Sequence, residues 1–288
     1  MITARTFIID SVVIRKVVRQ QLSAVTAFFL LAPALAWAAQ AGVIELVEGE
    51  VQIISKSGEV VAVRTAQPVS EGDTVATGKT GEVHFRMEDQ ALIAVRPNTR
   101  MRIDAYRALG DGDDNSTLFL LKGTFRALTG WIGRYNRERY RIQTATTTIG
   151  IRGTDHEPAY FGADTTPAER DNHPPGSYDK VNLGETFIQN AAGKISVQQG
   201  RAGFAPAGVS GAPQLLERTP AFYRKTRNES TFESKREQQA KDIETKRIER
   251  IEKVREETRA SHSKDIDKSG TEKKGTARKR ATPKRESR

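Results

Sequence analysis

Short runs of alternating apolar and polar residues, separated by turn residues, fill the chain from about residue 42 to residue 209. In one run Val83 and Phe85 flank His84, and the alternation continues to Glu88. Successive side chains of a strand point to opposite faces, so a period of two buries one face and leaves the other in water. Because no helical period intervenes, the sequence predicts an all-β domain over residues 40–206, either β-solenoid-like or a sandwich of short antiparallel strands.

An internal echo indicates repeated hairpins within this domain. The stretch "GEVQIISKSGEV" from Gly49 aligns with "GETFIQNAAGKI" from Gly184, and a second glycine, Gly58 or Gly193, follows nine residues after the first in each. Glycine reaches the positive φ values that tight hairpin turns need. The repeat therefore predicts two β-hairpins that turn at Gly58 and Gly193.

The N-terminal segment resembles an export signal. Basic residues precede an apolar run over residues 22–39, which ends in the small-residue pair Ala36 and Ala38. This layout predicts a signal peptide over residues 1–38 that is cleaved after Ala38. The run is also just long enough to span a bilayer as an uncleaved anchor. We therefore expect a periplasmic protein, attached to the membrane if the leader is retained.

Two features of the composition exclude classes of function. The chain has no cysteine, which rules out thiol catalysis and Cys-zinc sites. The net charge of +10 lies in the two ends: residues 1–39 carry +3 and residues 223–288 carry +9, whereas residues 40–222, with 20 basic and 22 acidic side chains, carry −2. Because a nucleic-acid-binding domain is expected to be basic, the near-neutral body argues against nucleic acid as a partner.

The chain changes character after the β domain. Glycine, alanine and proline predict a linker over residues 207–227. Residues 228–260 are helix formers with interleaved charges and few apolar residues, which favours a solvated helix over a coiled coil. Residues 261–288 are predicted to be a disordered basic tail. On this division, truncation at Gly208 is expected to leave the unfolding midpoint unchanged.

The β region resembles the FecR family of bacterial envelope domains. The likeness starts at Gly42, covers Val69–Ile103 and a Thr-rich strand from Thr144, and extends to about Pro206. Two positions depart from the family pattern: Gln90 replaces a turn glycine, and Asp155-His156-Glu157 follows the Arg-Gly-Thr motif. The residues that carry the likeness are Gly72, Asp73, Thr77, Gly78, Pro97, Asn98, Thr99, Gly150, Arg152, Gly153 and Thr154.

The resemblance implies signalling, in which a periplasmic domain relays a transporter signal to a cytoplasmic sigma factor. That role needs a cytoplasmic domain, and only about 20 residues precede Leu22. We therefore expect this chain to lack the transmitting part.

Three clusters contain residue types that could support chemistry. Arg152 between two glycines suits framework, in which it pairs with a carboxylate or caps strand carbonyls, or a surface for a peptide or anionic partner. Asp155-His156-Glu157 is interpreted as a chance cluster in a polar loop, and the alternative is a metal site. Asp111–Thr117 is interpreted as a polar hairpin tip, and the alternative is a calcium loop. Without a nucleophile–base pair, the sequence predicts neither an enzyme nor a metal or cofactor site.

The expected function is therefore a non-enzymatic binding or interaction module of the envelope, whose partner is a protein or cell-wall material. The alternative is an accessory regulator of envelope signal transduction of the sigma/anti-sigma type. Residues 268–288 carry +7, with nine basic and two acidic residues, so the tail either contacts anionic surfaces or only solubilises the chain. The sequence does not indicate the oligomeric state.

Overall fold

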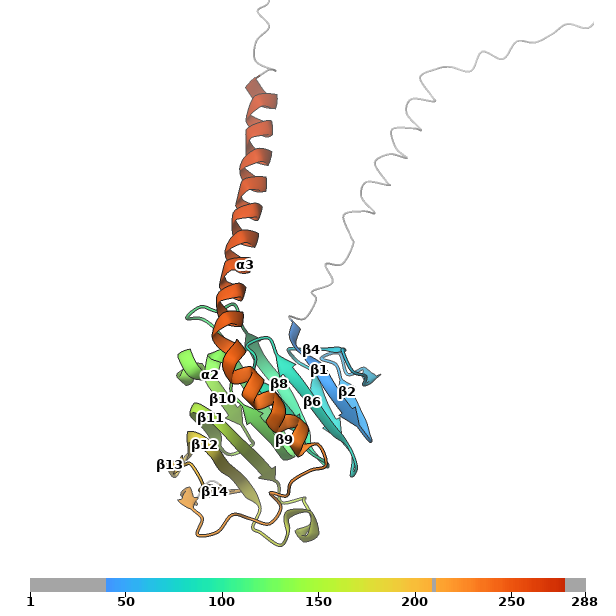
Figure 1. Ribbon diagram of the computed structural model, residues 1–288, viewed down its shortest axis with the longest axis vertical. Coiled ribbons are helices and arrows are strands. Elements are labelled where there is room, and N and C mark those ends of the chain that lie inside the picture. Colours follow the sequence, from blue (N-terminus) through green and yellow to red (C-terminus); the bar gives the residue numbers. More distant parts are fainter. Residues whose placement is uncertain (1–39, 209–210, 278–288) are drawn as a thin grey trace, which may run out of the picture. The chain divides into compact units, whose positions relative to one another are not determined.

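The computed structural model describes residues 40–208 and 211–277, with side chains up to residue 260 (Figure 1). The predicted leader, with Ala36 and Ala38, and residues 278–288 lie outside the described residues. Across the described part, no helix combines the length and the apolarity needed to cross a membrane.

The described chain forms one open, 15-stranded sheet and a long C-terminal helix, which confirms the predicted fold class. The strands are β1 (Gln40–Glu48), β2 (Val51–Ile54), β3 (Val60–Ala62), β4 (Pro68–Ser70), β5 (Thr74–Thr77), β6 (Glu82–Met87), β7 (Leu92–Val95), β8 (Arg100–Arg107), β9 (Asn115–Leu128), β10 (Tyr140–Gln143), β11 (Thr148–Phe161), β12 (Gly176–Asn190), β13 (Gly193–Gln198), β14 (Ala202–Pro206) and β15 (Gln214–Leu215). The helices are α2 (Trp131–Tyr135), η1 (Arg137–Arg139), η2 (Pro167–Arg170) and α3 (Glu229–Ala277).

Three long strands divide the sheet into two halves. The second part of β9 pairs with β7 and its first part with β8, and β12 likewise pairs with β14 and then with β13. Half A therefore contains β4, β1, β6, β7, β14 and β15, together with the parts of β9, β11 and β12 that adjoin them. Half B contains β3, β2, β5, β8, β10 and β13, together with the other parts of the same long strands.

Glycines lie where the chain passes from one half to the other. Gly49 between β1 and β2, Gly123 in β9, Gly153 in β11 and Gly184 in β12 have φ values of +67°, +89°, +63° and +81°. Only glycine adopts such values without steric cost, so these four positions allow the strands to bend.

The internal echo has a structural counterpart. β2 pairs with β3 around Gly58, and β12 pairs with β13, so both predicted hairpins are confirmed. The second one turns at Ala191 and Ala192, one position before the predicted Gly193, which opens β13. The leading glycines of the echo, Gly49 and Gly184, occupy two of the bends. The repeat therefore encodes a bend followed by a hairpin.

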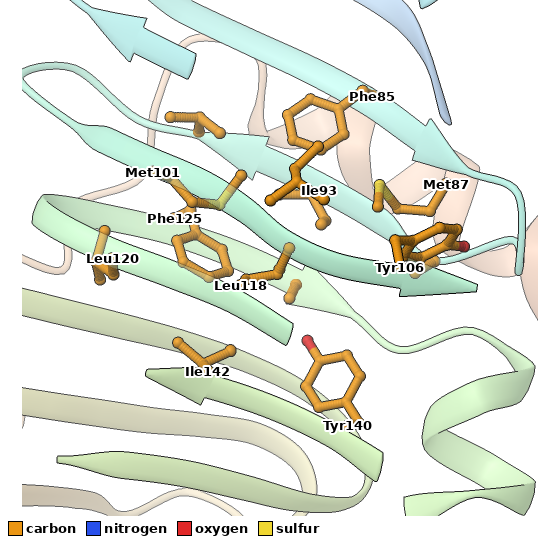
Figure 2. Packing of buried hydrophobic residues seen from close by; sticks show 14 of the residues in the cluster. Phe85, Met87, Ile93, Met101, Tyr106, Leu118, Leu120, Phe125, Tyr140 and Ile142 are labelled. Carbon is orange, nitrogen blue, oxygen red and sulfur yellow. The ribbon is translucent and has the colours of Figure 1, made fainter. Parts of the chain in front are cut away.

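The core lies between the two halves. Phe85 and Ile93 from half A and Met101, Leu118 and Ile142 from half B belong to one cluster of buried apolar side chains (Figure 2). Phe85, Met101 and Ile142 occupy the apolar positions of alternating strands, as the period of two requires, whereas Ile93 and Leu118 stand in apolar runs. Because one core serves both halves, the arrangement is closer to a sandwich than to a solenoid.

The outer face of half A is covered by α3 and is not open to water. Phe232 of α3 packs with Leu92, Ala94 and Leu128. His84, which the sequence places on an exposed polar face, is only 3% exposed. That expectation was wrong, because the alternation separates two faces of a strand without saying whether another element covers the second.

The first part of α3 is correspondingly buried, which corrects the picture of a solvated helix. Gln239 and Ile243 are each 1% exposed, and Gln239 donates hydrogen bonds to the carbonyls of Gln90 and Thr129 at 2.9 and 3.1 Å. Arg247 lies over the Tyr135 ring, with its guanidinium carbon 4.3 Å from the centroid. The docking side chains are too few to give a heptad pattern, and for that reason the sequence did not reveal them.

The segment predicted as a linker also packs on the sheet. Leu216, Phe222 and Tyr223 contact the apolar cluster that includes Phe161 and Tyr178. The predicted boundary at residue 260 falls within α3, which continues to Ala277.

Candidate functional site

The motif residues at the first turns serve the framework. Gly72 has a φ of +93°, and the Asp73 carboxylate accepts a hydrogen bond from the Ser70 N–H at 2.8 Å. Asn98 has a φ of +55° and donates its N–H to the Gly78 carbonyl at 3.0 Å. These contacts fix the loops that enter and follow β5.

Threonine hydroxyls tie the same loops to the bend in β9. Thr77 donates its hydroxyl to the Arg96 carbonyl at 2.6 Å and accepts the Thr99 N–H at 2.9 Å. Thr99 donates its hydroxyl to the Thr124 carbonyl at 2.9 Å, and its contact to the Pro97 carbonyl is 3.2 Å. Buried backbone groups left without ladder partners at a bend need such acceptors and donors. These motif residues therefore stabilise the fold.

The Thr-rich strand contributes two close approaches. A Cβ on Gly150 would lie 2.1 Å from Cζ of Phe187, so a glycine is needed beneath this ring. Beyond the bend at Gly153, the Thr154 N–H donates to the Thr129 hydroxyl at 2.9 Å. Both contacts hold β11 against its neighbours.

Arg152 is the motif side chain that faces outward. Its side chain is 67% exposed, and its Nη1 lies 3.1 Å from a carboxylate oxygen of Glu185. The predicted pairing with a carboxylate is therefore confirmed. The pair is exposed enough that water screens it, so it contributes little to stability.

The acids after the motif lie in the middle of β11. Asp155 and His156 are 0% exposed and Glu157 is 3% exposed. The interpretation of these residues as a chance cluster in a polar loop was wrong, because β11 continues through them to Phe161. Buried charges need partners, and the strand pairing supplies them.

Two arginines pair with these acids on the outer face of half A. Nε of Arg126 lies 2.8 Å from Asp155, and Nη2 of Arg96 lies 2.8 Å from Glu157. Burial by itself raises the pKa of both carboxyls, but the Arg126 hydrogen bonds outweigh it for Asp155. For Glu157 the charge of Arg96 and the hydrogen bond from Lys180 do the same, so both pKa values lie below their usual range. Both acids are therefore ionised at neutral pH.

The helix completes this network. Glu229 of α3 hydrogen-bonds to Arg126 and lies 3.2 Å from Nη1 of Arg96, and Glu233 lies 2.6 Å from Nη1 of Arg126. A cleft of about 150 Å³ remains beside these side chains, and Lys180 and Arg236 also line it. We call the set Arg96, Arg126, Asp155, Glu157, Glu229 and Glu233 the charge cluster. Its acids are held by arginines, an arrangement suited to docking α3.

Both buried histidines also form pairs with carboxylates. Nε2 of His84 lies 2.6 Å from Glu82, and Nδ1 of His156 lies 2.9 Å from Asp179. Burial by itself raises the pKa of Glu82, but the hydrogen bond with His84 outweighs it, so the pKa lies below its usual value. In the described part of the chain, no three His, Asp or Glu side chains are grouped to hold a metal ion.

Within Asp111–Thr117, the residues up to Asp114 form the tip of the β8–β9 hairpin and the rest belong to β9; the acids of the tip are all paired. The hydrogen bond from Arg107 lowers the pKa of Asp111 to about 2. Asp114 is 1% exposed and accepts hydrogen bonds from Trp131 Nε1 at 2.9 Å and from the Gly110 N–H at 2.7 Å. These hydrogen bonds occupy the carboxylates and fix the conformation of the loop.

An open groove lies on half B, around the Thr-rich strand. Its volume is about 1280 Å³. Gln143, Thr148, Arg152, Phe187, Gln189 and Lys194 are among the residues that line it. Arg152 lines this groove and Gly150 lies beneath its Phe187 ring, whereas the motif residues Pro97 and Asn98 line a second open cleft of about 880 Å³.

Sequence reasoning missed Arg96 and Arg126. Each stands in an apolar stretch, "LIAVRP" and "GTFRAL", where an unpaired arginine would be costly. That placement is the signal for a buried ion pair. It does not identify the partner.

The sequence comparison confirms the resemblance to a known family. Residues 73–167 match the family described as FecR protein. This range contains the motif residues from Asp73 to Thr154 and the acids that follow them. Among curated proteins, none matches this chain.

Three solved structures show partial likeness. Two are crystal structures of a protein assigned as an anti-sigma factor from Parabacteroides distasonis, at 9% and 10% identity and TM-scores of 0.39 and 0.38. Each alignment covers 51% of this chain and 60% of the other, so this chain spans less than two thirds of those proteins. The third is a cell surface anchoring domain at 24% identity, with a TM-score of 0.22 and coverage of 22% and 83%.

Proposed function

We propose that this chain, which carries a FecR domain over residues 73–167, is a non-enzymatic interaction module of the bacterial envelope that binds its partner through the groove of half B. The observation that carries the proposal is that most polar motif residues and buried acids are bonded within the fold, whereas many polar residues of the groove face solvent. The motif threonines and turn residues hold the bends, and the buried acids Asp155, Glu157 and Asp179 are paired with arginines or a histidine. The groove lies outside these contacts and is accessible.

The same division argues against catalysis. A general acid or base must reach a substrate, yet Asp155, His156 and Glu157 lie at 0–3% exposure within half A. Within the described residues, the carboxylates that line the groove are Glu138 and Glu185. Glu185 pairs with Arg152 and accepts a hydrogen bond from Ser196, so it does not stand as a free base.

In-cell photocrosslinking tests the proposal. A photoreactive amino acid at Thr148 in the groove should capture an envelope component, whereas the same probe at exposed Arg218, outside the groove, should not. The expected location is the periplasm, as a released domain or tethered by its leader. Recovery of the whole tagged protein in the cytoplasm would refute the proposal.

A second candidate is an accessory regulator of envelope signal transduction. The FecR match supports it, because that family name implies relay of a transporter signal to a sigma factor. A sigma-factor-dependent reporter should then change when this chain is deleted and recover when it is restored. A reporter that is unaffected by deletion would remove this candidate.

The basic tail is a third element of the proposal. Residues 268–288 carry +7, enough for electrostatic contact with phosphate-bearing lipids or anionic wall polymer. The protein should sediment with anionic vesicles at low salt and be released at high salt, because screening shortens to about 8 Å at physiological ionic strength. Deletion of residues 264–288 should abolish sedimentation. Equal sedimentation of both forms would show that the tail is not the anchor.

A further inference from the structure

An aromatic ring is held in the groove by the backbone beneath it. Phe187 of β12 stands opposite Gly150 of β11 in the strand register. Its Cζ and Cε1 would lie 2.1 and 2.3 Å from a Cβ at Gly150, so the ring covers this glycine closely. The ring is partly exposed to the groove. Its position is therefore set by the sheet.

Hydroxyl and amide side chains surround the ring on neighbouring strands. Thr148 and Gln189 are register partners on β11 and β12, and Ser196 of β13 is the register partner of Phe187. Gln143 of β10 stands opposite Thr148. Each of these groups both donates and accepts hydrogen bonds, as the hydroxyl groups of a sugar do. An aromatic surface among such groups suits a ring that is apolar on its faces and polar at its edge.

The groove also carries excess positive charge. Four basic residues and two acidic ones line it, a balance of +2: Arg137, Arg141, Arg152, Lys194, Glu138 and Glu185. Nζ of Lys194 lies 3.8 Å from the centroid of the Phe187 ring. A ligand that packs on this ring must draw Lys194 aside, and a carboxylate on the ligand does so by pairing with the ammonium. A neutral ligand lacks this compensation for the lost cation–π contact.

The backbone of the groove does not favour an extended peptide. β10 pairs with β9 and β11, and β12 pairs with β11 and β13, so the strands in the middle of the floor have neighbours on both sides. Peptides that bind by strand addition need an open edge, and on this floor β13, which pairs with β12 alone among the described strands, is the strand that offers one. Over β10, β11 and β12 recognition must come from side chains, which favours hydroxyl-rich ligands.

We infer that the groove binds an acidic polysaccharide, a glycan chain that carries carboxylates, with a sugar ring on Phe187 and a carboxylate at Lys194 or Arg141. This inference deepens the proposed function and rests on it, since it names the ligand class of the same groove. Gln143, Thr148, Gln189 and Ser196 then bind sugar hydroxyls.

Binding of polygalacturonate to the purified full-length protein tests the inference, with neutral dextran and polyglutamate as comparison polymers. Phe187→Leu keeps an apolar side chain of similar size and removes the aromatic face, whereas Phe187→Tyr keeps the face. We expect Phe187→Leu to weaken polygalacturonate binding at least about tenfold. Phe187→Tyr and the exposed control Arg218→Ala should bind within about twofold of the parent.

The variants also separate this inference from its rivals. Lys194→Gln should weaken binding and flatten its salt dependence, because one charge contact is lost. Absence of polygalacturonate binding, or equal binding by Phe187→Leu, overturns the inference. Polyglutamate binding of equal strength also overturns it, since any polyanion would then suffice. The photocrosslinking at Thr148 remains independent, because capture of an envelope protein would keep the proposed function while this ligand class fails.

Discussion

Removing the Phe232 side chain should destabilise the whole domain. Phe232 is 2% exposed and packs with Leu92, Ala94 and Leu128 on the outer face of half A. Its ring centroid lies 5.8 Å from that of His84 and 4.8 Å from the guanidinium carbon of Arg126. It is therefore the apolar anchor that seats α3 beside the charge cluster.

The magnitude follows from burial. Replacing a buried phenylalanine by alanine costs about 3–5 kcal/mol, and a site at the edge of the core belongs at the lower end, about 3 kcal/mol. In a domain of this size, each kcal/mol lowers the melting temperature by about 2–4 °C. Phe232→Ala should therefore melt about 6–12 °C below the parent protein.

Circular dichroism melts of the parent, Phe232→Ala and Ile248→Ala provide the test. Ile248 is on the same helix and is 47% exposed, so its substitution should shift the midpoint by no more than about 2 °C. A Phe232→Ala midpoint equal to that of Ile248→Ala would refute the docking of α3 on half A.

Three further predictions follow from the same contacts. Truncation after Gly208 should lower the unfolding midpoint, contrary to the sequence-based expectation, because it removes Phe232 and exposes Arg96 and Arg126. An unchanged midpoint in thermal melts would restore the linker interpretation. Gly150→Val should lower the free energy of unfolding, measured by urea denaturation, by about 2 kcal/mol or more, because the valine side chain would clash with the Phe187 ring. A variant as stable as the parent would contradict this close approach. Burial raises the pKa of Asp89 to about 6, although the hydrogen bonds that it accepts oppose this shift. The protonated carboxyl therefore contributes stability that is fully present below about pH 4 and is lost as the pH rises through about 6. The parent should lose stability over this interval relative to Asp89→Asn, and parallel stability–pH profiles would exclude the shift.

The strand pattern was readable from the sequence because it is local. Alternation identified the strands around Phe85, and the echo identified two hairpins. Gln90 was noted as a departure from a turn glycine, and it takes a φ of +65°, the conformation that glycine usually supplies. Each of these features depends on a few neighbouring residues, and for that reason one sequence was enough.

The charge cluster was not readable because its partners are distant in the chain. Arg126 and Asp155 are 29 residues apart, and Arg126 and Glu229 are 103 apart. A charged residue on a strand is equally compatible with solvent and with a buried pair, so the acids after Gly153 were assigned to a loop. The helix failed in the same way, since Phe232 and Ile243 form no regular stripe.

The near-neutral charge of the body conceals an uneven distribution. In half A, Arg96 and Arg126 are matched by acids from β11 and α3, so these charges cancel within the fold. The groove in half B keeps a balance of +2 on an accessible surface. A charge sum over residues 40–222, which leaves out the acids of α3, returns −2; it argues against nucleic acid but says nothing of a local cationic site. We therefore expect an anionic partner to meet the groove, whereas the buried arginines hold α3.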